Sequence, residues 1–205
     1  VSENMYEMLN GLRFSLDQWF EIKEYADKKQ ITLFSTVNSP TGIEYAEKIN
    51  LDAYKLSSWD FNYFQLFEKI SLLNKPMIID TGPVNVLELS KVLNIMHQNK
   101  NDDGILVHCF HTHKFDEMNM RSIPFMRDAF NALVGYSSRD SDSETDILAL
   151  ALDIVYLEKR LTLRRDLPGH HNNISMEPDQ FKSYVAQMRD LKSALGQKSL
   201  NPSDG

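Results

Sequence analysis

Hydrophobic and polar positions follow two alternating periods along the chain, and this alternation predicts an α/β fold. Segment 15–29 opens with the capping-box pair Ser15 and Gln18 and repeats apolar residues at helical spacing, which predicts a helix. Short apolar runs, of the type that is buried on both faces of a sheet, predict strands. The expected strands are residues 31–36, 53–58, 76–80, 104–109, 132–137 and 154–158.

Further helical patterns separate these strands. The expected helices are residues 41–49, 61–73, 85–98, 119–130, 143–152 and 178–195. A helix between successive strands is what parallel crossover connections require. The order predicts one domain over residues 1–196. Segment 197–205 carries Gly, Ser and Pro without periodicity, and we expect it to be a tail or a domain edge.

Two layouts suit this order: a doubly wound open sheet, or part of an eight-stranded (β/α)8 barrel of the TIM type. In both layouts the carboxyl ends of the strands meet at one rim, where binding sites form. Every expected strand ends in polar or ionisable residues. These groups are Ser35-Thr36, Lys55 with Ser58, Asp80-Thr81, His108 to His113, Ser137 to Arg139, and Glu158 to Arg160.

The composition excludes several classes of function. With 22 basic and 29 acidic residues the formal charge is -7, which argues against a broad surface for nucleic acid. The single cysteine, Cys109, excludes an intrachain disulfide. No apolar run is long enough to cross a bilayer, and the acidic first residues do not resemble a signal peptide. We therefore expect a cytoplasmic protein that binds neither nucleic acid nor a membrane.

Motifs at the strand ends resemble those of the sialic acid synthase family, which includes the legionaminic and pseudaminic acid synthases. They occur in the family's order, at family-like spacing, over nearly all of the chain. "LFST" resembles the family's FxST, "AYKLSS" its yKIxS and "KPMIIDTG" its KPvilSTG. Further along, "ILVHC", "VGYSSR", "YLEKRLTL" and "GHHNNISMEPDQF" resemble iLLHC, vGYSDH, iEKHfTl and GPDxxxSxxPdeF.

This resemblance implies a (β/α)8 barrel whose members condense phosphoenolpyruvate with an N-acetylated hexosamine in its open aldehyde form. A divalent metal ion normally holds and polarises the aldehyde in that family. The β/α units would correspond to the family's third to eighth strands, so we expect an incomplete barrel with about six units. Because an open barrel exposes sheet edges, it would need preceding sequence, rearranged helices or a partner chain, and a homodimer is one solution.

The resemblance also implies site residues, position by position. Thr36, Lys55, Ser58 and Ser137 match residues that bind phosphoenolpyruvate in the family, and an ammonium with hydroxyl donors suits an anion. The remaining substrate-binding positions depart from the family. Asp80, followed by Thr81, replaces the serine of STG, His111 and His113 replace an asparagine or serine and a tyrosine, and His171 replaces the aspartate of GPD. A carboxylate at position 80 is expected to repel a phosphorylated substrate.

Arg139 and Arg160 stand where the family has two metal-ligating histidines. A guanidinium offers no lone pair to a cation, so we expect no metal at that site. As catalytic residues, the two arginines would bind phosphate or carboxylate, or polarise the carbonyl in place of the metal. The alternative is a site that has lost its task, with the arginines paired to carboxylates at Asp140, Asp142, Glu158 or Asp166. Segment 137–146 is expected to be a solvated loop with a helix start.

The segment "HCFHTH" permits a second kind of metal site. Cys109, His111 and His113 would face one side of a strand, and His170 or His171 could supply a fourth ligand. Ligands two residues apart on a strand stand about 6–7 Å apart at their Cα atoms, so the chain would have to bend. The alternative is polar residues at the end of a strand.

Two functions of different classes therefore stand side by side. The first is a sialic acid synthase-like enzyme of surface carbohydrate biosynthesis that uses phosphoenolpyruvate and an N-acetylated amino sugar. The second is a catalytically degenerate relative that binds an anionic sugar or acts as a regulatory or structural subunit. The substitutions at the metal-ligand and GPD positions favour the second function.

Overall fold

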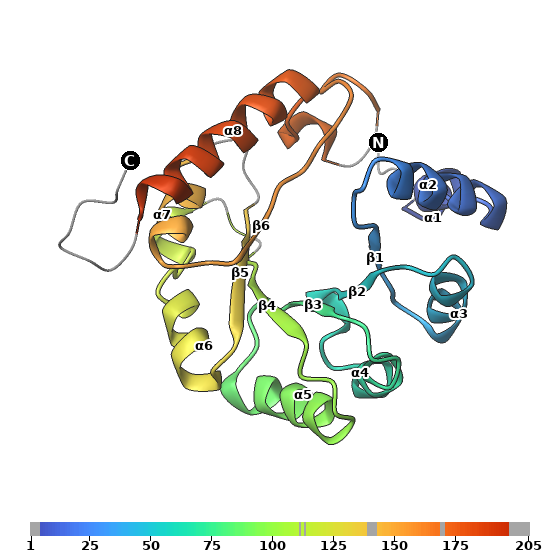
Figure 1. Ribbon diagram of the computed structural model, residues 1–205, viewed down its shortest axis with the longest axis horizontal. Coiled ribbons are helices and arrows are strands. Elements are labelled where there is room, and N and C mark those ends of the chain that lie inside the picture. Colours follow the sequence, from blue (N-terminus) through green and yellow to red (C-terminus); the bar gives the residue numbers. More distant parts are fainter. Residues whose placement is uncertain (1–4, 111, 113, 139–142, 169–170, 197–205) are drawn as a thin grey trace. The chain divides into compact units, whose positions relative to one another are not determined.

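Helices and strands alternate along the chain (Figure 1). The computed structural model describes residues 5–110, 112, 114–138, 143–168 and 171–196. The strands are β1 (Phe34–Thr36), β2 (Ala53–Leu56), β3 (Met77–Asp80), β4 (Gly104–His108), β5 (Leu133–Ser137) and β6 (Tyr156–Glu158). The α-helices are α1 (Met5–Gly11), α2 (Leu16–Lys28), α3 (Pro40–Lys48), α4 (Phe64–Ser71), α5 (Val86–Gln98), α6 (Ser122–Phe130), α7 (Glu144–Ala151) and α8 (Pro178–Ala194). Single turns of 3-10 helix are η1 (Ser58–Asp60), η2 (Phe115–Glu117) and η3 (Asn172–Ile174).

The chain forms two compact units, Val1–Leu106 and Val107–Gly205. The strand order follows the sequence from β1 to β6, and β4 runs across the division between the units. Within the first unit β2 pairs in parallel with β1 and with β3. Within the second unit β5 pairs in parallel with β6. Parallel neighbours joined through helices are the arrangement that the sequence pattern predicts.

Local capping residues explain where the helices begin. Ser15 caps α2 and Ser39 caps α3, each by accepting a hydrogen bond from a backbone N–H of the first turn. Asn85 does the same for α5 through the N–H groups of Leu87 and Glu88. These polar side chains satisfy donors that have no partner within the helix.

Residues with left-handed backbone conformation explain where many helices end. A residue with positive φ stands at or shortly after the end of each of α2 to α7. The conformation allows the last carbonyl groups of a helix to be satisfied, and asparagine tolerates it better than most residues with a side chain. These residues are Gln30, Asn50, Asn74, Lys100, Asn131 and Asp153.

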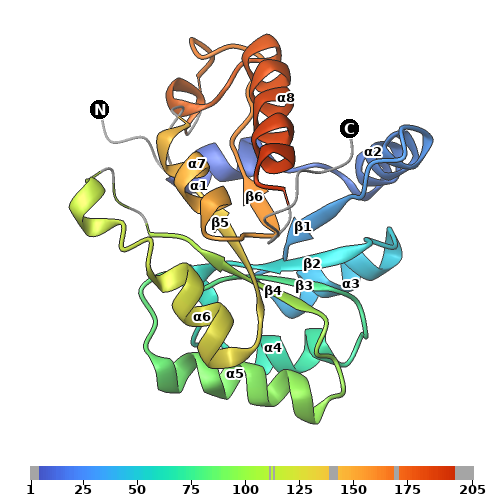
Figure 2. The same ribbon diagram turned by 60° about the vertical axis from the view of Figure 1, so that its left-hand side comes forward.

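Each unit has its own apolar core. In the first unit α3, α4 and α5 lie on one side of β2 and β3 (Figures 1 and 2). The strand residues Tyr54, Met77 and Ile79 are fully buried there, with Phe67 of α4. In the second unit Val134 of β5 and Ile123 of α6 are buried. Burial of such side chains stabilises the fold by roughly 1.5–3 kcal/mol each.

The predicted helices and strands are present, although several begin or end up to three residues away from the predicted position. The first strand begins at Phe34 rather than at residue 31, and Ile31 is largely exposed. Helix α1 was not expected from the sequence. None of the helices within the described ranges is long and apolar enough to cross a membrane.

Candidate functional site

The strand ends of the first unit bring a lysine and an aspartate together. Register pairs Thr36 with Lys55 and Lys55 with Ile78, and Asp80 stands two residues after Ile78. Because side chains alternate between the faces of a strand, Thr36, Lys55 and Asp80 belong to one face. Lys55 Nζ lies 3.2 Å from Asp80 Oδ2, and both side chains are only 11% exposed.

The loop after β3 packs against the segment that follows β2. Thr81 is buried, and Gly82 adopts a positive φ of 57°. A Cβ atom at Gly82 would lie 2.7 Å from the Cβ of Ser58, so only glycine allows this approach. The expected binding residues of the first unit therefore lie at the carboxyl ends of neighbouring strands. Their roles in binding stay predictions.

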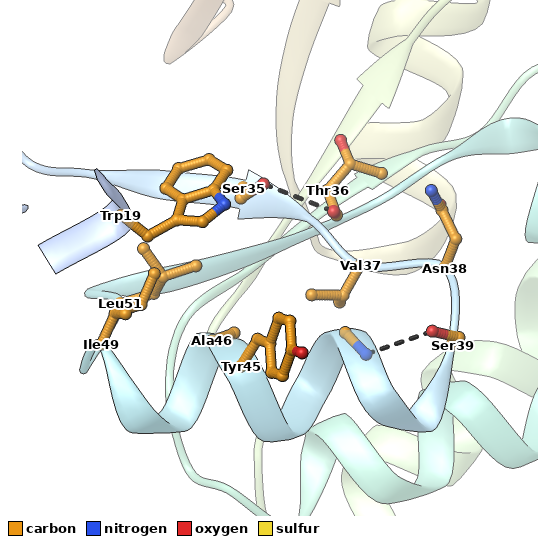
Figure 3. Close-up of a pocket in the computed structure, with 11 residues that line it drawn as sticks. Trp19, Ser35, Thr36, Val37, Asn38, Ser39, Tyr45, Ala46, Ile49 and Leu51 are labelled. Carbon is orange, nitrogen blue, oxygen red and sulfur yellow. Dashed lines mark hydrogen bonds between the residues drawn. The ribbon is translucent and has the colours of Figure 1, made fainter. Parts of the chain in front are cut away.

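A pocket of about 240 Å³ lies between β1 and α3, on the side of β1 opposite to the one toward which Thr36 points (Figure 3). Thr36 and Val37 point to opposite sides of the chain, and Val37 points toward α3 (Figure 3). Trp19 of α2 and Tyr45 of α3 also line this pocket. It belongs to the helix side of β1, so it is separate from the ion pair of Lys55 and Asp80.

In the second unit, Ser137 and Glu158 end two neighbouring strands at the same register position. Ser137 Oγ donates a hydrogen bond to Glu158 Oε1 at 3.0 Å, and Tyr156 OH donates to Glu158 Oε2 at 2.8 Å. Gly135 leaves room for the Tyr156 ring, because a Cβ there would lie 2.7 Å from Tyr156 Cδ1. A ligand anion that accepted a hydrogen bond from Ser137 would compete with Glu158 for the single hydroxyl proton.

Lys159, the residue that follows β6, belongs to a buried charged cluster. Lys159 Nζ lies 2.6 Å from Asp146 Oδ2 and donates to Ser138 Oγ at 2.6 Å. Tyr184 OH of α8 donates to the same Asp146 oxygen at 2.9 Å. The side chains of Lys159 and Asp146 are 3% and 0% exposed. Burial, together with the charge of Asp146, raises the pKa of Tyr184 far above its usual range.

This cluster corrects the expectation of a solvated loop over residues 137–146. The helix start at Glu144 is confirmed, but Ser137, Ser138 and Asp146 are buried. The signal that could have found Asp146 is its place beside Thr145 on the face of α7 that also carries Ala149 and Leu150. Sequence reasoning missed Asp146 and Tyr184, and treated Lys159 only as a member of a polar strand end.

His108 at the end of β4 is a buried, hydrogen-bonded side chain. Its Nε2 lies 2.7 Å from the carbonyl oxygen of Met118, so this nitrogen carries a proton. The ring stacks on Tyr136, with centroids 6.0 Å apart. Burial lowers the pKa of His108, while the hydrogen bond to Met118 opposes that shift.

The remaining expected site residues are only partly described. Arg160 is half-buried, and its carbonyl accepts from the N–H of Met176. His171 has a positive φ of 69° at the start of η3. Asp166, a possible partner of the arginines, pairs with Arg164. Arg139, Asp140, Asp142, His111, His113 and His170 lie outside the described residues.

The alternative metal site is therefore not tested by the geometry. Cys109 is buried and forms no disulfide bond. No group of three or more His, Cys, Asp and Glu side chains suited to a metal ion occurs within the described part of the chain. That finding does not include the two histidines of "HCFHTH", which the site would require.

Comparison with known proteins identifies the relationship. The model of the NeuB family matches residues 1–200. The chain is 28% identical over 198 residues to N,N'-diacetyllegionaminic acid synthase of Campylobacter jejuni, which covers 95% of this chain and 59% of that protein. The chain thus spans less than two thirds of this relative's length.

Solved structures give the same result for the fold. The crystal structure of N-acetylneuraminic acid synthetase from Leptospira borgpetersenii superimposes with a TM-score of 0.90 at 24% identity, covering 98% of this chain and 72% of that one. A phospho-2-dehydro-3-deoxyheptonate aldolase from Thermotoga maritima superimposes with a TM-score of 0.80 at 17% identity, covering 90% and 57%. These likenesses confirm an α/β fold of the TIM-barrel type with six parallel strands.

Proposed function

Because the chain belongs to the NeuB family, we propose that it serves the synthesis of nonulosonic acids by condensing phosphoenolpyruvate with an N-acetylated amino sugar. The observation that carries the proposal is the position of Lys55. Its ammonium group stands at the carboxyl end of β2, on the face that it shares with Thr36. A mostly buried ammonium beside a hydroxyl-bearing residue is suited to hold a small carboxylate or phosphate.

The reaction joins the methylene carbon of phosphoenolpyruvate to the aldehyde carbon of the open sugar. Negative charge develops on the aldehyde oxygen, which takes up a proton, and water adds at the enol carbon as phosphate leaves. In the first unit, Lys55, Thr36 and Ser58 would hold phosphoenolpyruvate. In the second unit, Arg139 and Arg160 would stabilise the developing alkoxide by charge and hydrogen bonding.

A divalent metal ion, which the family resemblance implies, does not fit the residues at its expected positions. Arg139 and Arg160 occupy them, and a guanidinium donates hydrogen bonds but has no lone pair for a cation. The proposed mechanism therefore contains no metal-dependent step. Its polarising charge comes from arginine.

Phosphate release tests this proposal directly. The chain would be incubated with phosphoenolpyruvate and a panel of N-acetylated hexosamines, with and without manganese and with a chelator. We expect phosphate release that depends on the sugar, persists with the chelator and is lost in Lys55→Met. Lys69→Met, which changes an exposed lysine of α4, is the matched control and should keep the activity. Release that requires manganese would contradict the assignment of the alkoxide to the arginines.

One observation favours a second function, in which the chain binds an anionic sugar without turnover. Asp80 holds Lys55 in an ion pair, and this offsets the positive charge that a phosphorylated substrate would need. Saturable binding of phosphoenolpyruvate or of an N-acetylated sugar acid, with no phosphate release under any condition, would support this function over the synthase. Failure of both binding and release would exclude both functions.

A further inference from the structure

The pair formed by Lys55 and Asp80 determines what charge a ligand meets at the end of β2. The two residues come from neighbouring strands, and register places their side chains on one face. Their charged atoms lie 3.2 Å apart, with each side chain 11% exposed. Because little water surrounds them, each charge acts more strongly on a nearby ion than it would at an open surface.

The loop after β3 holds this pair in place. Asp80 ends the strand, and Gly82 two residues later packs closely against Ser58. Thr81 between them is 2% exposed. The carboxylate therefore stands on a tightly packed stretch of chain and cannot swing away freely when a ligand approaches the ammonium group. A ligand anion bound to Lys55 therefore also lies near the carboxylate of Asp80.

The free-energy cost of placing an anion beside this pair depends on the charge of the ligand. A monoanionic carboxylate gains a hydrogen bond from the ammonium group and suffers the repulsion of one carboxylate. A dianionic phosphate suffers about twice the Coulomb repulsion from Asp80 and must also give up a larger hydration free energy. The attraction to the ammonium group doubles as well, but because the formal charge of the ion pair is zero, the pair adds little net attraction to offset the larger hydration free energy of the dianion.

We propose that Asp80 is a specificity-determining residue, which makes the site at Lys55 select a monoanionic carboxylate, such as that of a 2-keto acid, over a dianionic phosphate. In terms of phosphoenolpyruvate, Lys55 takes the carboxylate end and not the phosphate end. This inference deepens the proposed function and rests on it for the location of the anion at Lys55.

Calorimetric titration with three defined probes tests the inference. Pyruvate serves as the monoanionic carboxylate, inorganic phosphate at mildly alkaline pH as the dianion, and phosphoenolpyruvate as the ligand that carries both groups. The variants are Asp80→Asn, Asp80→Ser and Lys55→Met. Asp27→Asn is the matched control, because it removes the same charge from another lysine–aspartate pair of the first unit, Lys23 with Asp27.

We expect wild type to bind pyruvate more tightly than phosphate. In Asp80→Asn and Asp80→Ser the dissociation constant of phosphate should fall by about tenfold or more, with a change of less than about threefold for pyruvate. Asp27→Asn should change neither constant. Binding of all three probes should be lost in Lys55→Met.

The outcomes separate the inference from the proposed function. If Lys55→Met abolishes binding but the Asp80 variants leave the ratio of the phosphate and pyruvate constants unchanged, the inference is wrong and the anion site stands. If Lys55→Met binds all three probes like wild type, the anion site itself is wrong. Absence of binding to wild type and to both Asp80 variants would overturn the site and the inference together.

Discussion

Removing the charge of Lys159 should destabilise the second unit strongly. In Lys159→Met the carboxylate of Asp146 would remain fully buried without its ammonium partner, and Ser138 would lose a hydrogen-bond donor. Breaking a buried ion pair from one side costs about 3–5 kcal/mol of unfolding free energy. For a chain of this size that corresponds to a fall in Tm of roughly 6–20 °C.

A double-mutant cycle shows whether the cost comes from the pair. Asp146→Leu combined with Lys159→Met replaces both charges by apolar side chains of similar volume, and such replacement is often neutral. We therefore expect the double variant to be more stable than Lys159→Met alone. Lys182→Met makes the same chemical change at an exposed position of α8 and should cost less than about 0.5 kcal/mol.

The assay must report on the second unit. Both tryptophans of the chain, Trp19 and Trp59, belong to the first unit, so their fluorescence alone is insufficient. Urea unfolding followed by far-ultraviolet circular dichroism also includes α6, α7 and α8. A cost below about 1 kcal/mol for Lys159→Met, or a double variant whose cost equals the sum of the two single costs, would refute the reasoning.

Three further predictions follow from single residues. Burial raises the pKa of Tyr184 and of Tyr54. Their contribution to stability is therefore complete below the ordinary tyrosine pKa of about 10 and is lost as the pH rises above it. Urea unfolding on both sides of that pH should show a smaller alkaline loss of stability in Tyr184→Phe than in wild type. Burial lowers the pKa of His108, so the free energy of unfolding should fall as the pH drops below about 6.5. The variant His108→Gln keeps a donor for the Met118 carbonyl and should remove that acid dependence in the same urea unfolding measurement. Gly82→Ala should cost about 1–3 kcal/mol of unfolding free energy because of its positive φ and its contact with Ser58, whereas Gly11→Ala, which meets no atom within 4 Å, should cost far less.

Local signals in the sequence predicted most of the elements. Helices α2, α3 and α5 each begin directly after a capping residue, which is Ser15, Ser39 and Asn85 respectively. The strands β2 and β3 could be found because they are apolar runs that are buried on both faces and bounded by polar residues. The start of β1 was placed too early because apolar character alone does not show where pairing with β2 begins.

Contacts between segments distant in sequence could not be predicted in the same way. Asp80 was expected to repel a phosphate, but its ion pair with Lys55 depends on the register of two strands, which the sequence pattern does not specify. Asp146 stands at the end of a run of polar residues, which is typical of a solvated loop. Its place on the buried face of α7 is a local signal, but its partners Lys159 and Tyr184 come from distant segments, which no local pattern specifies.

The alternation of side chains along β6 and into the residue that follows it gives Glu158 and Lys159 different contacts. Glu158 belongs to the face shared with Ser137, where it accepts two hydroxyl protons. Lys159, one position later, turns to the helices and pairs with Asp146. A shift of register by one residue would exchange these faces and leave both charges without their partners. The buried pair of Lys159 and Asp146 therefore fixes the register that presents Glu158 to Ser137, and stability and site geometry in the second unit depend on the same strand.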